Sequence, residues 1–316
     1  MAPNLSLLLG AFLLLLVAVQ SKNHTKPPEK GFKFLQHLQG CHKGQTVKGL
    51  HELKRYLEKF GYLNYGTTNN HHHSKSTATI SNLNHANDDM FDDILESAVR
   101  SYQSYYHLKV TGSLDSETVQ QMILPRCGVA DVVNNATNMK HPRLFNMVAQ
   151  YSFFPGKPRW PASKTRLTYS FQSSAQVVGL QELRSVCSRA FKKWQDVSRF
   201  TFVEAPQGAD GDIVIGFHRG NHGDGYPFDG PGRTFAHAFA PTRGWFHYDA
   251  DENWSSNPNM NQVDLESLAV HEIGHVLGLG HSEDLNAIMY AYFSYGTIKR
   301  DLNANDIEGI RVLYSS

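Results

Sequence analysis

The hydrophobic positions of the N-terminal half follow a helical period. Apolar residues recur every three to four positions from Phe32 to Leu63 and again from Phe91 to Tyr102, which predicts an amphipathic helix in each stretch. A third, shorter helix is expected from Ser116 to Ile123, because residues 114–117 supply N-terminal capping groups. The pattern therefore predicts a small three-helix domain over residues 32–124.

Beyond Trp160 the pattern changes to short apolar runs of strand length. We expect a helix at 180–197 among these runs and two further helices near the C-terminus, the first beginning near Asp264. The order of these elements predicts an α+β domain built on a mostly parallel sheet. The strands are expected at residues 167–171, 200–204 and 213–217.

The N-terminus and one long polar stretch lie outside this pattern. The apolar run 7–19 is too short to cross a bilayer and polar residues follow it, so we interpret residues 1–21 as a signal peptide, with a buried helix as the alternative. Residues 64–87 contain His71–His73, but their polar composition favours a solvated linker over a metal site. Secretion would make three sequons available for glycosylation, at Asn23, Asn135 and Asn253.

Composition narrows the classes of function. Lys and Arg total 30 against 29 Asp and Glu, so the balance indicates no nucleic-acid or anionic-membrane partner. The 17 histidines are the outlier, and imidazole is the commonest side-chain ligand for zinc. Three cysteines allow at most one intrachain disulfide, so at least one thiol stays outside it. An unpaired thiol in an oxidising compartment needs an explanation. They are Cys41, Cys127 and Cys187, the last expected to be a packed thiol on the helix at 180–197.

The stretch from His271 to His281 carries the decisive chemistry. His271 and His275 are four residues apart, so on a helix both imidazoles project from one face and can bind one ion. Gly278 lets the backbone leave the helix, and His281 can return as a third ligand. The fourth position stays open for a water, and Glu272 is placed to act as its general base. The alternative, a helix with core histidines, would need these spacings by accident.

The complete pattern H-E-x-x-H-x-x-G-x-x-H resembles that of the matrixins, the matrix metalloproteinases of the metzincin clan. Ser282 after the third histidine and Met289, at the position of the family's Met-turn, strengthen the resemblance and disfavour an astacin or adamalysin. The resemblance implies a twisted, mostly parallel five-stranded sheet with three helices, preceded by a three-helix prodomain. The chain looks most like the plant matrixins, with no haemopexin-like domain expected.

The segment 125–131, Pro-Arg-Cys-Gly-Val-Ala-Asp, resembles the matrixin cysteine switch. The resemblance implies that Cys127 occupies the fourth zinc position and keeps a precursor latent, with Arg126 and Asp131 paired to hold the loop. A disulfide of Cys127 with Cys41 or Cys187 is the alternative.

Further metal positions follow from the same resemblance. A structural zinc is implied for four residues: His222, Asp224, His237 and His247. A calcium site is implied for another six, with solvated loop acids as the alternative: Asp229, Gly230, Gly232, Thr234, Asp249 and Glu252. Asp212 matches the first carboxylate of a second calcium site, but Trp245 stands where an aspartate is expected, so cation binding there is weakened or absent.

We therefore expect a signal peptide at 1–21, a helical propeptide at 22–150 with its cleavage site between Ala136 and Tyr151, and a protease domain at 151–316. The expected function is a monomeric, secreted zinc endopeptidase of the apoplast or extracellular matrix. Its partners would be protein substrates, an activating protease and protein inhibitors. A deep apolar specificity pocket is expected between Ser267 and the segment 291–293. The rival hypothesis is a zinc-stabilised extracellular protein that binds glycan or cell wall without proteolysis.

Overall fold

A computed structural model describes residues 32–65, 87–131 and 151–315. Several sequence-based expectations lie outside these residues: the signal segment 1–21, the sequons at Asn23 and Asn135, the run His71–His73, and the cleavage region up to residue 150. We call residues 32–124 the helical unit and residues 151–315 the sheet unit.

In the helical unit, the expected single helix from Phe32 to Leu63 is wrong. The structure has a 3₁₀-helix η1 (Lys33–Leu38) and a separate helix α1 (Leu50–Lys59). Between them Gly40, Gly44 and Gly49 all adopt left-handed φ angles of 90°, 91° and 99°, which a continuous right-handed helix cannot contain. The apolar spacing therefore continues along the sequence although the glycines interrupt the helix.

The other two expected helices of this unit are confirmed. They are α3 (Asp93–Tyr105) and α4 (Ser116–Met122). Asp92 caps α3 by accepting from the Leu95 amide, and Asp115 caps α4 by accepting from the Thr118 amide. The capping chemistry expected before Ser116 is therefore present.

The sheet unit contains the predicted mostly parallel five-stranded sheet, in the order β2-β1-β3-β5-β4. Every neighbouring pair is parallel except β4 and β5. A short parallel pair, β6 (Trp254–Ser255) with β7 (Val263–Asp264), lies outside it. The five main strands are β1 (Arg166–Phe171), β2 (Thr201–Glu204), β3 (Ile213–His218), β4 (Ala236–Ala238) and β5 (Trp245–Asp249).

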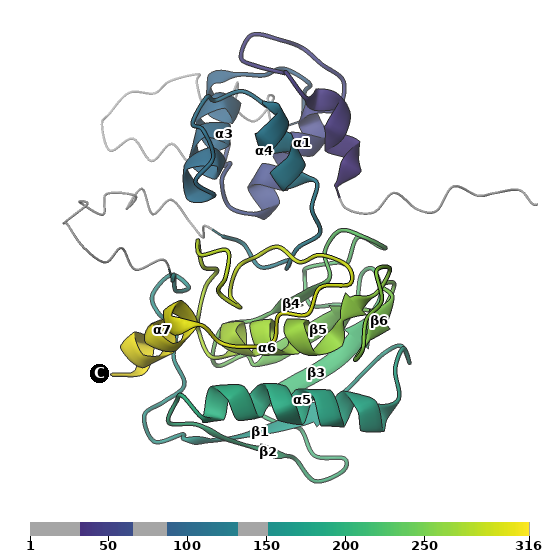
Figure 1. The fold of residues 1–316 in the computed structure, drawn as a ribbon, viewed down its shortest axis with the longest axis vertical. Helices are drawn as coiled ribbons and strands as arrows, with labels where there is room; N and C mark the ends of the chain where they lie inside the picture. Colours follow the sequence, from purple (N-terminus) through teal and green to yellow (C-terminus); the bar gives the residue numbers. More distant parts are fainter. Residues whose placement is uncertain (1–31, 66–86, 132–150, 316) are drawn as a thin grey trace, which may run out of the picture.

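Three helices complete the sheet unit: α5 (Leu180–Gln195), α6 (Leu265–Val276) and α7 (Ala304–Tyr314). Helices α5 and α6 pack on each other and on the sheet (Figure 1). Trp194 of α5 is fully buried between them and donates its indole N–H to the Val270 carbonyl at 2.7 Å. Apolar burial on this scale holds α6 rigidly in place. No helix in the described ranges is long and apolar enough to cross a membrane.

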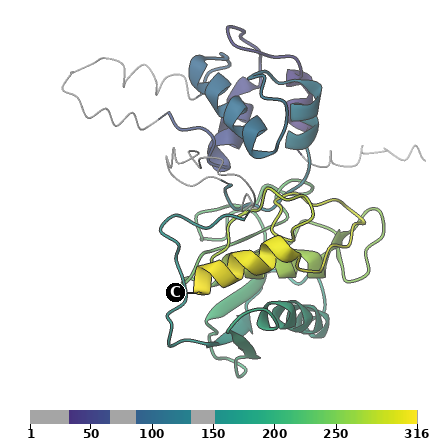
Figure 2. The same ribbon diagram turned by 60° about the vertical axis from the view of Figure 1, so that its left-hand side comes forward.

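The helical unit sits on the loops that follow α6 (Figures 1 and 2). Its hydrophobic core includes three residues of the sheet unit, Tyr290, Ala291 and Tyr292. The Tyr292 hydroxyl lies 2.8 Å from that of Tyr56 and 2.6 Å from that of Tyr102. The two units therefore share one aromatic core at their junction.

The start of α6 offers a test of stability. Asp264 is 1% exposed, accepts from the Ser267 amide at 3.0 Å and pairs with Arg300 at 2.6 Å. Asp264→Ala removes the cap and the closest ion pair of Arg300, which then keeps only Glu266 at 3.6 Å as an ion-pair partner within the described ranges. We expect the free energy of unfolding to fall by about 3 kcal/mol in denaturant titrations. Asp264→Asn, which keeps a capping oxygen, should lose clearly less. Equal losses in the two variants would contradict this account.

Candidate metal centre and active site

Helix α6 and the turn after it bring three imidazoles together. His271 and His275 project from the same face of the helix, and their Nε2 atoms are 3.1 Å apart. Gly278 has φ 103°, and a side chain there would meet the Pro158 carbonyl at 2.6 Å, so the sharp exit from the helix requires glycine. The turn returns His281, whose Nε2 lies 3.2 Å from that of His275. All three rings are fully buried.

The partners of the other ring nitrogens decide what these three rings can do. Nδ1 of His271 donates to the Ile288 carbonyl at 2.7 Å, and Nδ1 of His275 donates to the Leu279 carbonyl at 2.8 Å. Nδ1 of His281 donates to the Asp131 carboxylate at 2.7 Å. Burial lowers the pKa of each ring, so all three are neutral at pH 7. Three Nε2 lone pairs therefore converge, an arrangement that a zinc ion between them satisfies.

Cys127 closes the fourth side of this cluster. Its Sγ lies 3.5 Å from His275 Nε2, and the four candidate ligand atoms are all within 4.8 Å of one another. Burial raises the pKa of the Cys127 thiol well above its ordinary value, so only a bound cation would hold it as a thiolate. All three cysteines are free thiols, so the alternative of a Cys127 disulfide is not present here.

Segment 125–131 is held in a cleft by backbone hydrogen bonds to both walls. On one wall the Cys127 amide donates to the Ala291 carbonyl at 2.9 Å. On the other wall, which β4 forms, the Gly128 amide donates to the Ala236 carbonyl at 2.8 Å. A peptide strand can therefore lie between these walls with its central residue at the histidines.

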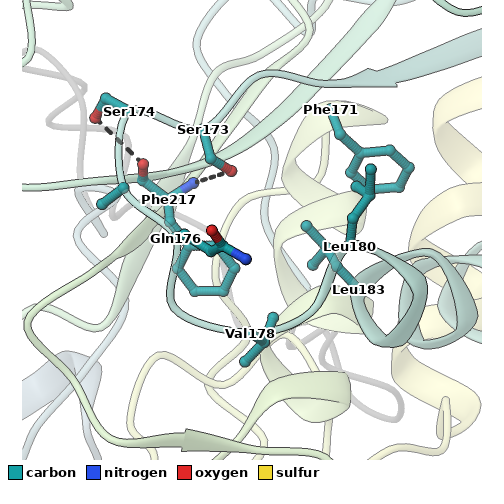
Figure 3. A pocket seen from close by; sticks show the side chains of 9 residues that line it. Phe171, Ser173, Ser174, Gln176, Val178, Leu180, Leu183 and Phe217 are labelled. Carbon is teal, nitrogen blue, oxygen red and sulfur yellow. Dashed lines mark hydrogen bonds between the residues drawn. The ribbon is translucent and has the colours of Figure 1, made fainter.

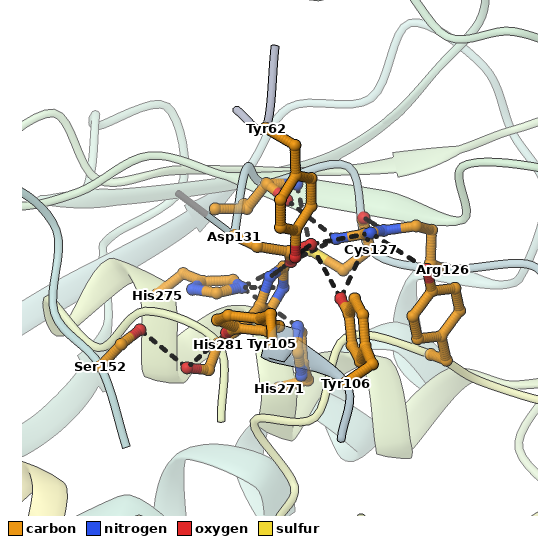
Figure 4. A network of polar contacts seen from close by, with 12 residues as sticks. Tyr62, Tyr105, Tyr106, Arg126, Cys127, Asp131, Ser152, His271, His275 and His281 are labelled. Carbon is orange, nitrogen blue, oxygen red and sulfur yellow. Dashed lines mark hydrogen bonds and ion pairs between the residues drawn. The ribbon is translucent and has the colours of Figure 1, made fainter. Parts of the chain in front are cut away.

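The side chains of the segment form a buried polar network (Figure 4). Arg126 and Asp131 pair at 2.5 Å, with both side chains fully buried. The Arg126 guanidinium also lies 3.6 Å from the centre of the Phe60 ring. Burial alone would raise the pKa of Asp131, but the Arg126 charge and His281 outweigh it and hold that pKa below its usual range.

Glu272 lies directly beside the cluster. It is fully buried, and neither carboxylate oxygen has a hydrogen-bond partner within the described ranges. Burial raises the pKa of Glu272 to about 8. A partnerless carboxyl group next to three metal-binding nitrogens suits a group that takes up and releases a proton.

A tight turn supports the histidines from below. Asp306 accepts from the Ile288 amide at 2.9 Å and from the Met289 amide at 3.1 Å, which fixes the turn that carries Met289. Gly274 of α6 has no side chain, and a Cβ there would overlap the Met289 sulfur and lie 2.9 Å from Trp194. The neighbouring Asn305 accepts from the Ser282 hydroxyl at 2.8 Å. The role of Asp306 was not expected from the sequence.

A second cluster combines three histidines and an aspartate. Oδ2 of Asp224 lies 2.8 Å from His222, 2.7 Å from His237 and 2.9 Å from His247. His237 and His247 face each other across β4 and β5. Burial lowers the pKa of His247 to about 3, so its ring is neutral at pH 7. The four ligand atoms meet as a closed cation site requires.

The six residues expected to bind calcium lie around one loop. Asp249 is fully buried and its Oδ2 has no hydrogen-bond partner within the described ranges. Burial raises the pKa of both Asp249 and Glu252 to about 7, so a cation bound beside them would favour their charged forms. Gly230 and Gly232 have left-handed φ angles of 77° and 88°.

A lysine side chain pairs with a carboxylate at each of the two candidate calcium sites. Lys59 of the helical unit donates to Asp229 at 3.2 Å and to the Thr234 hydroxyl at 2.8 Å. Asp212, the candidate for a second calcium site, accepts from Lys164 and from the Thr168 amide and hydroxyl. The Asp212 oxygens are thus occupied by the protein itself.

A separate hollow of about 280 Å³ lies between β1, β3 and the start of α5 (Figure 3). Phe171, Leu183 and Phe217 form its apolar part. Ser173 accepts from the Phe217 amide and Ser174 donates to the Phe217 carbonyl. Its lining contains no acid, base or histidine and shares no residue with the clusters above, so it has no catalytic constellation.

The packing of Met289 against α6 is testable. We expect Gly274→Ala to push Met289 and its turn away from α6, because the new methyl group would occupy the position of the sulfur. The free energy of unfolding should fall by about 2 kcal/mol, and bound zinc should be released faster to a chelator. The variant Met289→Ala measures the cost of losing the methionine by itself. Adding Gly274→Ala to it should cost less than in the wild type, because only the contact with Trp194 then remains. A Gly274→Ala variant as stable as the wild type would refute the close contact.

Comparison with known proteins places these features in context. Residues 159–315 match the family model described as Matrixin, and residues 46–122 match that of a putative peptidoglycan binding domain.

Individual relatives cover most of the chain. Metalloendoproteinase 2-MMP of Arabidopsis thaliana is 43% identical over 295 residues, which cover 88% of this chain and 73% of the relative. Metalloendoproteinase 1 of Glycine max is 44% identical over 279 residues, or 86% of this chain and 84% of the relative. Interstitial collagenase of Sus scrofa is 38% identical over 219 residues, or 68% of this chain and 42% of that protein.

Proposed function

Since this chain belongs to the matrixin family of zinc-dependent metalloendopeptidases, we propose that it is a secreted endopeptidase made as a latent precursor. One observation carries the proposal. The three converging Nε2 atoms of the histidines meet the Cys127 sulfur on one side and lie beside the partnerless Glu272. The histidines would hold the catalytic zinc, and the substrates are proteins.

The residues of the cleft have separate tasks in hydrolysis. Zinc held by His271, His275 and His281 would supply a Lewis acid for the scissile carbonyl and lower the pKa of a water. Glu272 accepts the proton of the attacking water and then delivers it to the departing amine nitrogen. The carbonyls of Ala291 and Ala236, which now hold segment 125–131, bind the backbone of a substrate strand in the same cleft.

Latency follows from occupation of this cleft. Cys127 stands at the fourth ligand position, and its neighbours use the backbone groups that a substrate would need. An activating protease that cuts between Ala136 and Tyr151 would separate segment 125–131 from the sheet unit. The junction is then held only by non-covalent contacts.

Two further cation sites would stabilise the sheet unit. We assign a structural zinc to His222, Asp224, His237 and His247, because the closed set leaves no position for water. Calcium at the loop of Asp229, Asp249 and Glu252, with oxygen atoms of Gly230, Gly232 and Thr234, would neutralise the buried carboxyl groups of Asp249 and Glu252. Asp229 differs from these two because Lys59 of the helical unit already pairs with it. No calcium is assigned to Asp212, because Lys164 already neutralises it.

The cellular setting is part of the proposal. The apolar N-terminal segment supports secretion, to an extracellular matrix or apoplast. Asn253, the sequon within the described ranges, is exposed and available for glycosylation. We propose a monomer that meets protein substrates and protein inhibitors at this cleft and an activating protease at the segment between Ala136 and Tyr151.

The rival function, glycan binding without proteolysis, finds less support. The family match of residues 46–122 names a putative peptidoglycan binding domain, which makes the idea reasonable for the helical unit. That unit, however, completes its own core with residues 290–292 of the cleft wall. Its contacts with the sheet unit therefore explain its presence without a glycan ligand.

Removal of the general base tests the mechanism. Glu272→Ala should lower kcat/KM on peptide substrates by about a thousandfold or more, while zinc content and the unfolding transition stay unchanged. The precursor would be activated by a protease or an organomercurial, and cleavage would be followed by mass spectrometry with and without a chelator. Activity that survives chelation or the substitution would reject zinc hydrolysis with Glu272 as base.

Specificity should follow from the apolar pocket that we propose beside His271. Phe293 packs edge-on against the His271 ring at 5.0 Å. The Ser267 hydroxyl donates to Asp264 and accepts from the Lys299 amide at 2.8 Å, so it offers no free polar group to a substrate. We expect Leu or another large apolar residue directly after the scissile bond to exceed Asp or Lys about tenfold or more in kcat/KM. A peptide library that shows a preference for Asp or Lys would disprove an apolar pocket.

A further inference from the structure

The three cluster histidines differ in the origin of their Nδ1 partners. His271 and His275 donate to carbonyls of the sheet unit, Ile288 and Leu279. His281 donates to Asp131, which belongs to segment 125–131 and leaves with the propeptide. We infer that Asp131 is a positioning residue for His281, through which the propeptide helps the precursor to retain its catalytic metal. This inference rests on the metal site proposed above.

The Asp131 carboxylate is fixed in space by three elements. Its Oδ2 accepts from Tyr62 at 2.7 Å, from Tyr106 at 2.8 Å and from Arg126 at 3.0 Å. Its Oδ1 accepts from Arg126 at 2.5 Å and from His281 at 2.7 Å. The carboxylate is fully buried and cannot turn away from the imidazole (Figure 4).

A carboxylate that accepts from Nδ1 supports a metal-binding imidazole more strongly than a carbonyl does. It fixes the tautomer that presents Nε2 to the metal, holds the plane of the ring and makes the ring a stronger donor. Loss of such a partner typically weakens metal binding ten- to a hundredfold. His281 is the ring on the turn that leaves α6, so its orientation depends more on such a partner than that of the two helical rings does.

Activation therefore removes two supports of the metal at once. The Cys127 sulfur leaves the cluster, and His281 loses the hydrogen bond to its Nδ1. The Tyr105 hydroxyl, 3.3 Å from the His281 carbonyl, departs as well, while Ser152 keeps its bond to that carbonyl at 2.7 Å. The activated enzyme thus holds zinc less tightly than the precursor, and part of the difference belongs to Asp131.

Metal retention can be measured on the intact precursor without any use of activity. All variants carry Glu272→Ala to prevent self-cleavage, and zinc affinity is determined by competition with a chromophoric chelator. We expect Asp131→Ala to bind the cluster zinc ten- to a hundredfold more weakly than the parent. Cobalt substitution monitors the cysteine, because the sulfur-to-cobalt absorption band reports whether Cys127 is still a ligand.

Control variants separate positioning from anchoring of the loop. Tyr62→Phe and Tyr106→Phe each remove one hydrogen bond to Oδ2 and leave Oδ1 with Arg126 and His281. Both should stay within about threefold of the parent affinity. Nitrogen-15 NMR of labelled histidine should show the His281 Nδ1 proton in these controls and its loss or shift in Asp131→Ala. Asp131→Asn, similar in size, serves if Asp131→Ala fails to fold.

The outcomes separate this inference from the proposed function. A parent precursor that binds no zinc at the histidine cluster overturns the metal site and the inference together. A normally loaded parent with unchanged affinity in the Asp131 variants overturns the inference alone. The same holds if Tyr62→Phe or Tyr106→Phe weakens zinc binding as much as Asp131→Ala, because Asp131 would then act only through the loop.

Discussion

The structure depends on one constraint: three histidine Nε2 atoms meet, and no proton lies between them. Nδ1 of each ring donates to another acceptor, so each Nε2 carries a lone pair toward the others. Buried acceptors without a donor cost about 1 to 3 kcal/mol each, and a cation at their centre turns that cost into binding energy. The glycine exit at residue 278, the Met289 turn and its Asp306 support all serve to hold this geometry.

The same geometry makes latency a property of the site. A ligand at the fourth position keeps water out of that position. Burial keeps the Cys127 thiol neutral unless a cation binds it. Cys127 can act as that occupant because backbone bonds from both cleft walls hold its neighbours in place. Under the proposed function, inhibition and substrate binding would use the same hydrogen-bonding groups, so one would exclude the other.

The junction of the two units links latency to folding. Tyr290, Ala291 and Tyr292 form a wall of the cleft, yet they are buried in the hydrophobic core of the helical unit. Under the proposed function their environment would change when the propeptide leaves, since two tyrosines would lose their packing and the Tyr292 hydroxyl would lose both of its tyrosine partners. The relatives in plants share both units with this chain over most of its length, which fits a junction that depends on both.

Local rules determined much of this protein from the sequence alone. The four-residue spacing of His271 and His275, the cap of α4 and the order of strands and helices are short-range properties, and the structure has them as expected. The prediction of one helix from Phe32 to Leu63 was wrong because it used apolar spacing alone. That spacing does not reveal that three glycines adopt left-handed backbone angles. Only the tertiary structure placed Asp131 against His281, 150 residues away, and Asp306 under the Met289 turn. Such partners leave no signal in one sequence, because any buried acid could occupy them and only the folded chain selects which one does.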